Sequence, residues 1–535
     1  MFPSALRQLI NDVTPKMNPD ICNGLAVKHL KYVEEYIDSI FRSVSSGFPP
    51  GLTYDGCRRC SPEEEYALTT KKKVSRCVFD VARSDIYLME YRFSWQGKPL
   101  PTKYLYLPFV NDAGVIYVSG SRFVISPILA DRVISIGIAN VFVKLIKAKL
   151  TFNRTPHHFL ANGQRESIQV AWSDIYNEKS NPNAPRATVK ANCTLAHYLF
   201  CKYGFKETFN KFAGMEPIIG YDEINPETYP ENEWVICEST KIKPKGFGKL
   251  FYEPTPIRIA VKHEHYTGFV KSMIAGFFYC ADHFPQRIRA EYVNHTRLWM
   301  VLLGHIIWSG NISEGKLHSD ITDHIQSLDE YVDNIVKIKL REIGYNIDNI
   351  YELFGLIINN FNDWLLQSDD RVNTSYDKEL SILYYICFDI SSAIIKLYFK
   401  LKAASKKEIN ENKINKIMTL ILKPGLIYKI TREHGEVSTT STSGDNKALK
   451  TTLLVVPQSN SNRGKNKKDR MAINDPAKRL HASLAEVNAF FNTPKSDPSG
   501  RSRLSLYLGV TESGLIVRNE KFKQLIDDTQ QLFRR

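Results

Sequence analysis

The hydrophobic pattern changes from helical to strand-like early in the chain. Between residues 25 and 46, apolar side chains recur at steps of three and four, which predicts an amphipathic helix that ends near Gly47. From 53 to about 143, short runs of β-branched and aromatic residues alternate with Gly, Pro and Asn-Asp, which predict a mostly antiparallel β region. The proline-rich segment 150–290 favours short strands and loops over long helices.

A helical pattern returns in the second half of the chain. Apolar residues at helical spacing predict four helices within 291–407, packed as an insert or subdomain; they fall near 298–308, 328–343, 350–366 and 380–401. Beyond them, Ser, Thr, Gly, Asn and Lys dominate 433–470 apart from the strand-like 451–456, which predicts a flexible linker.

These patterns together predict a multidomain α+β fold. A chain of 535 residues has room for about two to four domains of about 100–200 residues each. We expect a β-rich region over 1–150 and a mixed region over 151–425 that includes the helical part 291–407. A flexible, basic C-terminal region is expected over 426–535.

Composition excludes two broad classes of protein. With 43% hydrophobic and 24% charged residues, the chain is neither largely disordered nor a membrane-embedded bundle. Its most apolar stretch, 382–401, contains Asp389, Lys396 and Lys400, so it predicts a buried helix rather than a membrane span. Nine scattered cysteines and no readable signal peptide predict a protein without disulfides that stays in the cell where it is made.

The charge distribution favours a polyanionic partner. The net charge is +14, and residues 461–535 contain fifteen Lys and Arg against eight Asp and Glu, which is half of the whole excess. These cations are interleaved with Phe490, Phe491 and Tyr507 rather than set on one helix face. This arrangement suits contacts to a phosphate backbone better than reading of base edges in the major groove.

Two groups of residues have the types that bind metals. Cys57 and Cys60 have the spacing of half a zinc site, but no second half follows, so unligated loop cysteines are the favoured interpretation. The segment His263-Glu264-His265, together with Cys280, Asp282 and His283, could bind a divalent ion if the histidines alternate along a strand; ordinary strand and loop residues are the safer interpretation.

No catalytic motif is readable. Neither Gly-rich phosphate-binding motif occurs, which disfavours nucleotide hydrolysis by a P-loop. The adjacent histidines His157 and His158 lack a nucleophile or carboxylate at a telling distance, so a surface pair is expected. The carboxylate pairs Asp320/Asp323, Asp369/Asp370 and Asp527/Asp528 are best explained as solvated helix faces.

One stretch, residues 107–126, resembles the protrusion-domain segment of multisubunit RNA polymerase β subunits. In that family a strand ends in Pro, and an Asp-x-Gly turn and a hairpin follow it. Pro108, Asp112, Gly114 and Gly120 fall on the family positions without a gap, although Arg122-Phe123 stand where the family has Glu-Arg. The chemistry is consistent, because Asp can close an Asx-type turn and Gly tolerates positive φ.

The resemblance implies an N-terminal half of a β subunit. The family's Cys-Pro-x-Glu-Thr-Pro-Glu-Gly segment and the lysines of its C-terminal half do not occur here. The phiKZ-like jumbo bacteriophages split β and β′ into separate polypeptides, so the chain is similar to the N-terminal β part of such an enzyme, of the non-virion type. On this interpretation, 1–150 is protrusion-like, 151–425 is lobe-like and 426–535 ends in a fork-like segment.

The resemblance also implies how the work of the enzyme is divided. The magnesium-binding Asp-x-Asp-x-Asp loop of this class belongs to β′ and is absent here, so we expect no catalytic residue or cofactor on this chain, with Mg²⁺ on a β′-like partner. Expected partners are a C-terminal β-like polypeptide, split β′-like polypeptides, a promoter-specificity subunit, DNA and nascent RNA. The location would be the cytoplasm of the infected bacterium or a phage-made compartment, with no membrane contact.

The residues expected to contact phosphates lie in the basic C-terminal region. They are Arg463, Lys465, Lys467, Lys468, Arg470, Lys478, Arg479, Arg501 and Arg503. Each could instead be a solvated surface cation, as we expect for about half of them.

Two other classes of function remain open at this point. A phage structural or DNA-packaging protein could use the same basic tail to bind DNA. A stand-alone nucleic-acid-processing enzyme is disfavoured by the lack of a carboxylate cluster.

Overall fold

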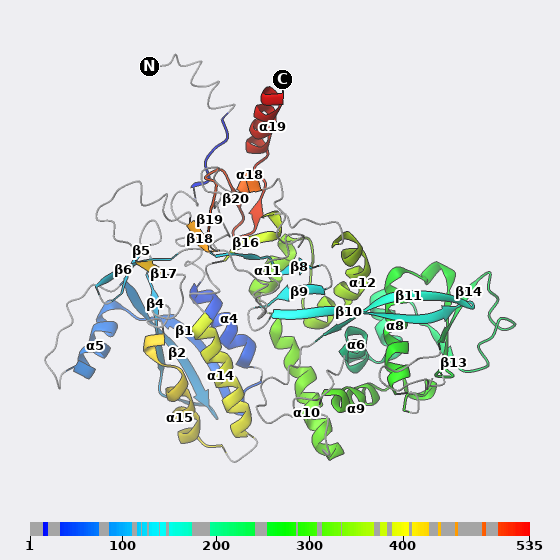
Figure 1. Ribbon diagram of the computed structural model, residues 1–535. Helices are drawn as coiled ribbons and strands as arrows, with labels where there is room; N and C mark the ends of the chain where they lie inside the picture. Colours follow the sequence, from blue (N-terminus) through cyan, green and yellow to red (C-terminus); the bar gives the residue numbers. More distant parts are fainter. Residues whose placement is uncertain are drawn as a thin grey trace, which may run out of the picture. The chain divides into compact units, whose positions relative to one another are not determined.

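The chain is divided between two structural units, each built around its own core. The first unit comprises Met1–Arg132, Asp333–Lys339 and Arg371–Arg535, and the second comprises Val133–Val332 and Leu340–Asp370. The computed structural model describes residues 14–19, 33–45, 47–73, 85–109, 115–118, 120–125, 128–137, 140–145, 149–173, 193–240, 254–284, 287–307, 313–332, 334–368, 375–381, 388–405, 409–426, 437–439, 455–457, 484–487 and 501–534 (Figure 1).

A four-stranded antiparallel sheet forms the centre of the first unit. Its strands are β1 (Leu52–Arg59), β2 (Ile86–Trp95), β3 (Lys98–Pro99) and β4 (Lys103–Pro108), and β2 pairs with all three others. The turn from β2 to β3 contains Gln96 and Gly97, both at positive φ, which is the geometry of a tight hairpin turn.

Aromatic packing joins this sheet to helix α4 (Val33–Ser45). The helix buries one apolar face, and the ring of Phe41 lies 5.1 Å from Tyr54, 5.0 Å from Tyr91 and 5.6 Å from Phe93. Such a cluster is worth more than its area alone, because tilted and edge-to-face rings attract one another. The position of α4 is therefore set by the face of the sheet that carries Tyr91 and Phe93.

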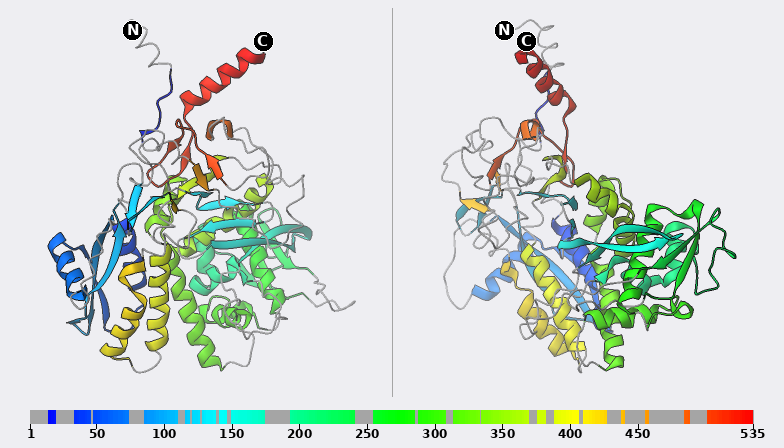
Figure 2. Two further views of the ribbon diagram at one scale, coloured as in Figure 1. Left: turned by 60° about the vertical axis from the view of Figure 1, so that its left-hand side comes forward. Right: turned by 45° about the vertical axis from the view of Figure 1, so that its right-hand side comes forward.

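Two later helices complete this core. Helix α14 (Phe388–Ser405) packs against α4, and α15 (Glu411–Ile421) packs against α14 (Figures 1 and 2). The ammonium of Lys103 on β4 is buried and donates hydrogen bonds to Asn415 at 2.6 Å and Thr419 at 2.9 Å, both on α15. Burial lowers the pKa of Lys103, and the two acceptors stabilise the buried group.

The remaining elements of the first unit are short hairpins and helices. Strand β5 (Val115–Val118) pairs with β6 (Ser121–Ile125), which also pairs with β17 (Val437–Thr439). The other pairs are β7 (Ile128–Asp131) with β16 (Lys378–Ser381), β18 (Val455–Pro457) with β19 (Arg501–Arg503), and β20 (Gly509–Val510) with β21 (Ile516–Val517). The helices are α5 (Pro62–Lys73), α18 (Leu484–Val487) and α19 (Glu520–Arg534), with a 3₁₀ turn at Ser375–Asp377 and another at Pro424–Leu426.

The second unit is organised on an eight-stranded sheet. Its main path runs β12 (Cys193–Thr194), β11 (Gln164–Ser173), β10 (Lys149–Ala161), β14 (Trp234–Ser239), β15 (Arg258–Lys262) and β13 (Ile218–Gly220), and β9 (Asn140–Lys144) joins β10 to β8 (Ile134–Ile136). Strands β10 and β11 form a long hairpin whose turn holds Asn162 and Gly163 at positive φ. Asn-Gly is the residue pair that such a turn favours.

The helices of the second unit share an aromatic core. They are α6 (Leu195–Tyr203), α7 (Phe205–Ala213), α8 (Gly268–His283), α9 (Thr296–Ile307), α10 (Glu314–Ser327) and α12 (Ile350–Ser368), while α11 (Asn334–Glu342) spans the division between the units. Short 3₁₀ turns lie at His263–His265, Ala290–Tyr292 and Leu328–Tyr331. The ring of Phe200 lies 4.7 Å from Trp299, and Phe205 lies 4.8 Å from Phe277.

The structure confirms the α+β class and the helix predicted near residues 25–46, whose described part is Val33–Ser45. The expectation of no long helix within 150–290 is wrong, because α8 runs over sixteen residues. Most side chains of α8 are buried, so its sequence has no polar stripe at helical spacing that would indicate a helix. The three-part division of the chain stays a prediction, and the helices between 296 and 405 are distributed over both units.

The prediction of four helices within 291–407 needs three corrections. The helix expected over 328–343 is a 3₁₀ turn at Leu328–Tyr331 followed by the shorter α11 at Asn334–Glu342. Helix α10 was not expected; its sequence is mostly polar and buries only the narrow stripe Leu317, Ile321 and Ile325. The last predicted helix does not begin at 380, because Lys378–Ser381 pairs as β16 with β7.

Among the described residues, no helix is long and apolar enough to cross a membrane.

Replacing Phe41 by Ala should lower the free energy of unfolding by about 3–5 kcal/mol, because the ring is fully buried against three other rings. Urea unfolding followed by circular dichroism measures the change. The matched control is Phe399→Ala on α14, where the side chain is 59% exposed and the loss should stay below about 0.5 kcal/mol. Equal effects of the two substitutions would show that α4 does not pack as described.

Candidate nucleic-acid interface

The segment that resembles the β-subunit protrusion forms a strand end and a hairpin. Strand β4 ends at Pro108, which is buried, and β5 pairs with β6 so that Val118 faces Ser121 across the turn. Gly120 lies in that turn, exposed and at φ +77°, where a side chain would be strained. The hairpin and the role of Gly120 are as predicted, whereas Asp112 and Gly114 lie outside the described residues.

Asp85 ties this hairpin to the central sheet. Its backbone N–H donates to the carbonyl of Tyr117 at 2.6 Å, and its carboxylate accepts from the N–H of Tyr117 at 2.9 Å. Its carbonyl accepts from the N–H of Phe109 at 2.8 Å. The start of β2, the end of β4 and strand β5 are therefore held at one point.

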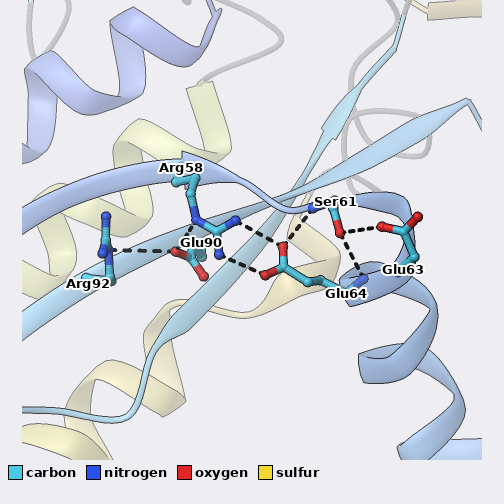
Figure 3. Close-up of polar contacts among 6 residues, drawn as sticks. All are labelled: Arg58, Ser61, Glu63, Glu64, Glu90 and Arg92. Carbon is cyan, nitrogen blue, oxygen red and sulfur yellow. Dashed lines mark hydrogen bonds and ion pairs between the residues drawn. The ribbon is translucent and has the colours of Figure 1, made fainter.

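A network of charges covers one face of the same sheet (Figure 3). Arg58 donates through Nε to Glu90 at 2.9 Å and through both terminal nitrogens to Glu64 at 3.0 Å each, while Arg92 lies 3.7 Å from Glu90. Hydrogen bonds to Glu64 and Glu90 raise the pKa of Arg58, and the hydrogen bonds from Arg58 lower the pKa of Glu64. The charge of Arg58 is therefore neutralised within the fold.

The start of α5 holds Glu64 in this position. The hydroxyl of Ser61 accepts from the N–H of Glu64 at 3.3 Å, and the carboxylate of Glu64 accepts from the N–H of Ser61 at 2.8 Å (Figure 3). This reciprocal pair is a capping box, and Pro62 occupies the first helical position, where a missing N–H costs nothing. The sequence Ser-Pro-Glu-Glu thus fixes the carboxylate that binds Arg58.

The opposite face of the sheet carries a cation that stacks on aromatic rings. The guanidinium of Arg59 lies 4.1 Å from the ring centre of Tyr87 and 6.0 Å from that of Phe109. Arg59 is exposed, and Phe109 is 49% exposed. Sequence reasoning missed this group, although the alternation of a strand already separates neighbouring arginines onto two faces.

The comparison with known families is decisive for the class of protein. A model of the family described as "non-virion RNA polymerase subunit" matches residues 1–514. The chain belongs to this family. A search of curated proteins finds no match.

Family membership makes the chain a subunit of a phage RNA polymerase of the non-virion type, so other polymerase subunits are its partners. This finding favours the polymerase interpretation over the structural or packaging protein and over the stand-alone enzyme. The polymerase is a complex, and this chain is one part of it.

Most of the cations expected to contact phosphates cannot be located in the polymerase subunit. Arg463, Lys465, Lys467, Lys468, Arg470, Lys478 and Arg479 lie outside the described residues. Arg501 and Arg503 begin and end strand β19, where they pair with Pro457 and Val455 of β18. Their contact with nucleic acid stays a prediction.

The cysteines considered as half a zinc site are free thiols in the subunit. Cys57 donates to the carboxylate of Asp38 at 3.6 Å, and burial raises its pKa to about 11. Cys60 is buried, and burial raises its pKa also. Among the described residues, no three His, Cys, Asp or Glu side chains converge on a point where a metal could bind.

The histidine-rich segment does not form the strand on which a divalent site depended. His263–His265 is a 3₁₀ turn, in which Nε2 of His263 lies 2.8 Å from the carbonyl of Glu231. On α8, Cys280 contacts Thr194 at 3.6 Å. The less favoured alternative, in which the two histidines alternate on one strand face, is therefore wrong.

The histidines His157 and His158 are not a surface pair as expected. His157 lies on β10 and is only 9% exposed, and its Nε2 is 3.4 Å from the carboxylate of Asp282. That carboxylate also accepts from the hydroxyl of Ser239 at 2.6 Å. The expectation failed because the partner of His157 lies on a helix more than a hundred residues later in the chain, beyond the reach of local pattern.

Alkylation of Cys57 tests this environment. At pH 8 only about a thousandth of a thiol with a pKa near 11 is ionised, so iodoacetamide should label Cys57 at least about tenfold more slowly than an unhindered thiol. The rate should rise as the pH approaches 11. Mass spectrometry of the peptide measures labelling; fast labelling at pH 8 that zinc suppresses would instead show a metal-binding pair with Cys60.

Proposed function

We propose that this polymerase subunit is the N-terminal part of a split β subunit and forms one wall of the DNA cleft during transcription of phage genes. The observation that carries the proposal is the order of Pro108 at the end of a strand and Gly120 at positive φ in the following hairpin turn. This order matches the protrusion segment of β subunits, and the family match supports a polymerase role for the chain.

The proposal assigns a role to each region of the chain. Residues 1–150 are protrusion-like, 151–425 are lobe-like, and 426–535 lead into a fork-like segment near the active centre. The subunit binds DNA and nascent RNA through phosphates, in a way that depends on salt and not on base sequence. It works in the cytoplasm of the infected bacterium or in a phage-made compartment within it.

The chemistry of nucleotide addition belongs to a partner in this proposal. Mg²⁺ is held by a β′-like polypeptide. A C-terminal β-like polypeptide completes the β subunit, and a promoter-specificity subunit directs the enzyme. This chain contributes surface and position instead of a reacting group.

Co-purification from infected cells tests the proposed place in the enzyme. A tagged copy of this chain should bring down a polypeptide with the C-terminal β segment together with β′-like polypeptides, in equal amounts and with transcription activity. Mass spectrometry identifies the companions. A complex in which another polypeptide already supplies the N-terminal β part would contradict the proposal while leaving the family membership intact.

Salt dependence of DNA binding tests the basic C-terminal region. If Lys465, Lys467 and Lys468 contact phosphates, the triple change to Gln should reduce the slope of log K against log salt by about 0.9 for each lost contact to duplex DNA. Fluorescence anisotropy with a labelled duplex measures the slope.

The matched control for that triple variant removes three lysines from exposed helix positions. It is Lys396→Gln, Lys400→Gln and Lys416→Gln on α14 and α15, where all three side chains are exposed. Equal slopes for the two triple variants would show that the predicted cations have no special part in binding.

A further inference from the structure

The motif that resembled half a zinc site contains two adjacent arginines with different surroundings. In the sheet, Arg58 pairs with Glu90 and Arg59 pairs with Met89. Neighbouring residues of a strand point to opposite faces, and directly paired residues share one. Arg58 therefore lies on the same face of the sheet as Glu90. Arg59 lies on the opposite face, which α4 covers at Tyr91 and Phe93.

The charge of Arg59 is not neutralised in the way that the charge of Arg58 is. Arg58 has the carboxylates of Glu64 and Glu90 within 3.0 Å. For Arg59 the described residues provide no ion pair; its guanidinium lies against the rings of Tyr87 and Phe109, and the carboxylate of Glu65 on α5 lies within electrostatic reach of it. A guanidinium that stacks on a ring keeps its N–H edge available for an anion.

The aromatic rings beside Arg59 are held by the backbone of the sheet. Tyr87 pairs with Leu107 in the register of β2 and β4, and Phe109 follows two residues later, so all three lie on one face. Phe109 comes after Pro108, whose ring fixes φ, and its N–H is bound to Asp85. The backbone that carries these rings is therefore in place before a ligand arrives, which lowers the entropic cost of binding.

We propose that Arg59, Tyr87 and Phe109 form a binding site for single-stranded nucleic acid. An unpaired base stacks on the exposed ring of Phe109, and Arg59, supported by Tyr87, binds the adjacent phosphate. The combination of an aromatic platform and a cation is what sequence-neutral recognition of single strands requires. In a duplex the faces of the bases are already stacked on one another, so the site selects an unpaired strand.

This inference deepens the proposed function, because a wall of a transcription cleft meets strands that have been separated. It depends on Arg59, Tyr87 and Phe109, and none of these residues belongs to the basic C-terminal region. The two ideas can therefore fail independently.

Binding of labelled twelve-nucleotide probes to the full-length chain tests the site. Fluorescence anisotropy with oligo-dT should show that Phe109→Ala weakens binding about 5- to 100-fold, which is the range for loss of one base–aromatic stack. Phe109→Trp should retain the affinity. Oligo-rU in place of oligo-dT decides whether the strand is DNA or RNA, and a duplex of equal length should be insensitive to Phe109→Ala.

Substitutions of Arg59 separate charge from stacking. Arg59→Ala should lower both the affinity and the salt slope, by about 0.7 for one lost phosphate contact to a single strand. Arg59→Lys should retain the slope but lose affinity, because an ammonium lacks the planar face that stacks on Tyr87.

The control is Tyr66→Ala on α5, an aromatic residue that is 70% exposed and is not one of the three residues of the site; this variant should bind as the unaltered chain does. Equal losses for Phe109→Ala and Tyr66→Ala, or no binding of single strands at low salt, would overturn the inference. If Phe109→Ala has no effect while the triple lysine variant loses nucleic-acid binding, the proposed function is supported and the site at Arg59, Tyr87 and Phe109 is refuted.

Discussion

The register of β1, β2 and β4 is the constraint on which the surface of the first unit depends. Helix α4 buries the face that carries Tyr91 and Phe93, and that burial fixes the register, because a slip by one residue would bring polar side chains under the helix. The same slip would exchange the faces of the sheet on which Arg58 and Arg59 lie. The packing of an apolar core thus decides which arginine is neutralised by carboxylates and which stacks on aromatic rings.

Local pattern predicted the elements whose signal is contained in their own residues. The amphipathic stripe of α4 and the short β-branched and aromatic runs of the N-terminal strands are of this kind, and the structure has a helix and a sheet there. Pattern failed for α8, which is buried nearly all round, and for α10, whose apolar stripe is one residue wide. The β10–β11 hairpin could have been predicted from Asn162-Gly163, a residue pair typical of tight hairpin turns. The prediction for the proline-rich segment 150–290 did not use it.

The candidate interface shows the same division between local and distant information. The turn at Gly120 followed from a motif, because a tight turn needs a residue that tolerates positive φ. The grouping of Arg59 with Tyr87 and Phe109 joins positions up to fifty residues apart, and it can be deduced only once the register is known. His157 illustrates the limit, since its carboxylate partner comes from a helix that sequence reasoning did not predict.

The buried ammonium of Lys103 has a consequence for the order in which the chain matures on the ribosome. Its acceptors Asn415 and Thr419 are synthesised about three hundred residues later, and α14, which packs on α4, is also late. The second unit, by contrast, is nearly contiguous from Val133 to Val332. Because domains tend to fold as units during synthesis, we expect the second unit to fold first, while the N-terminal sheet stays incomplete, with Lys103 hydrated by water, until α14 and α15 are made.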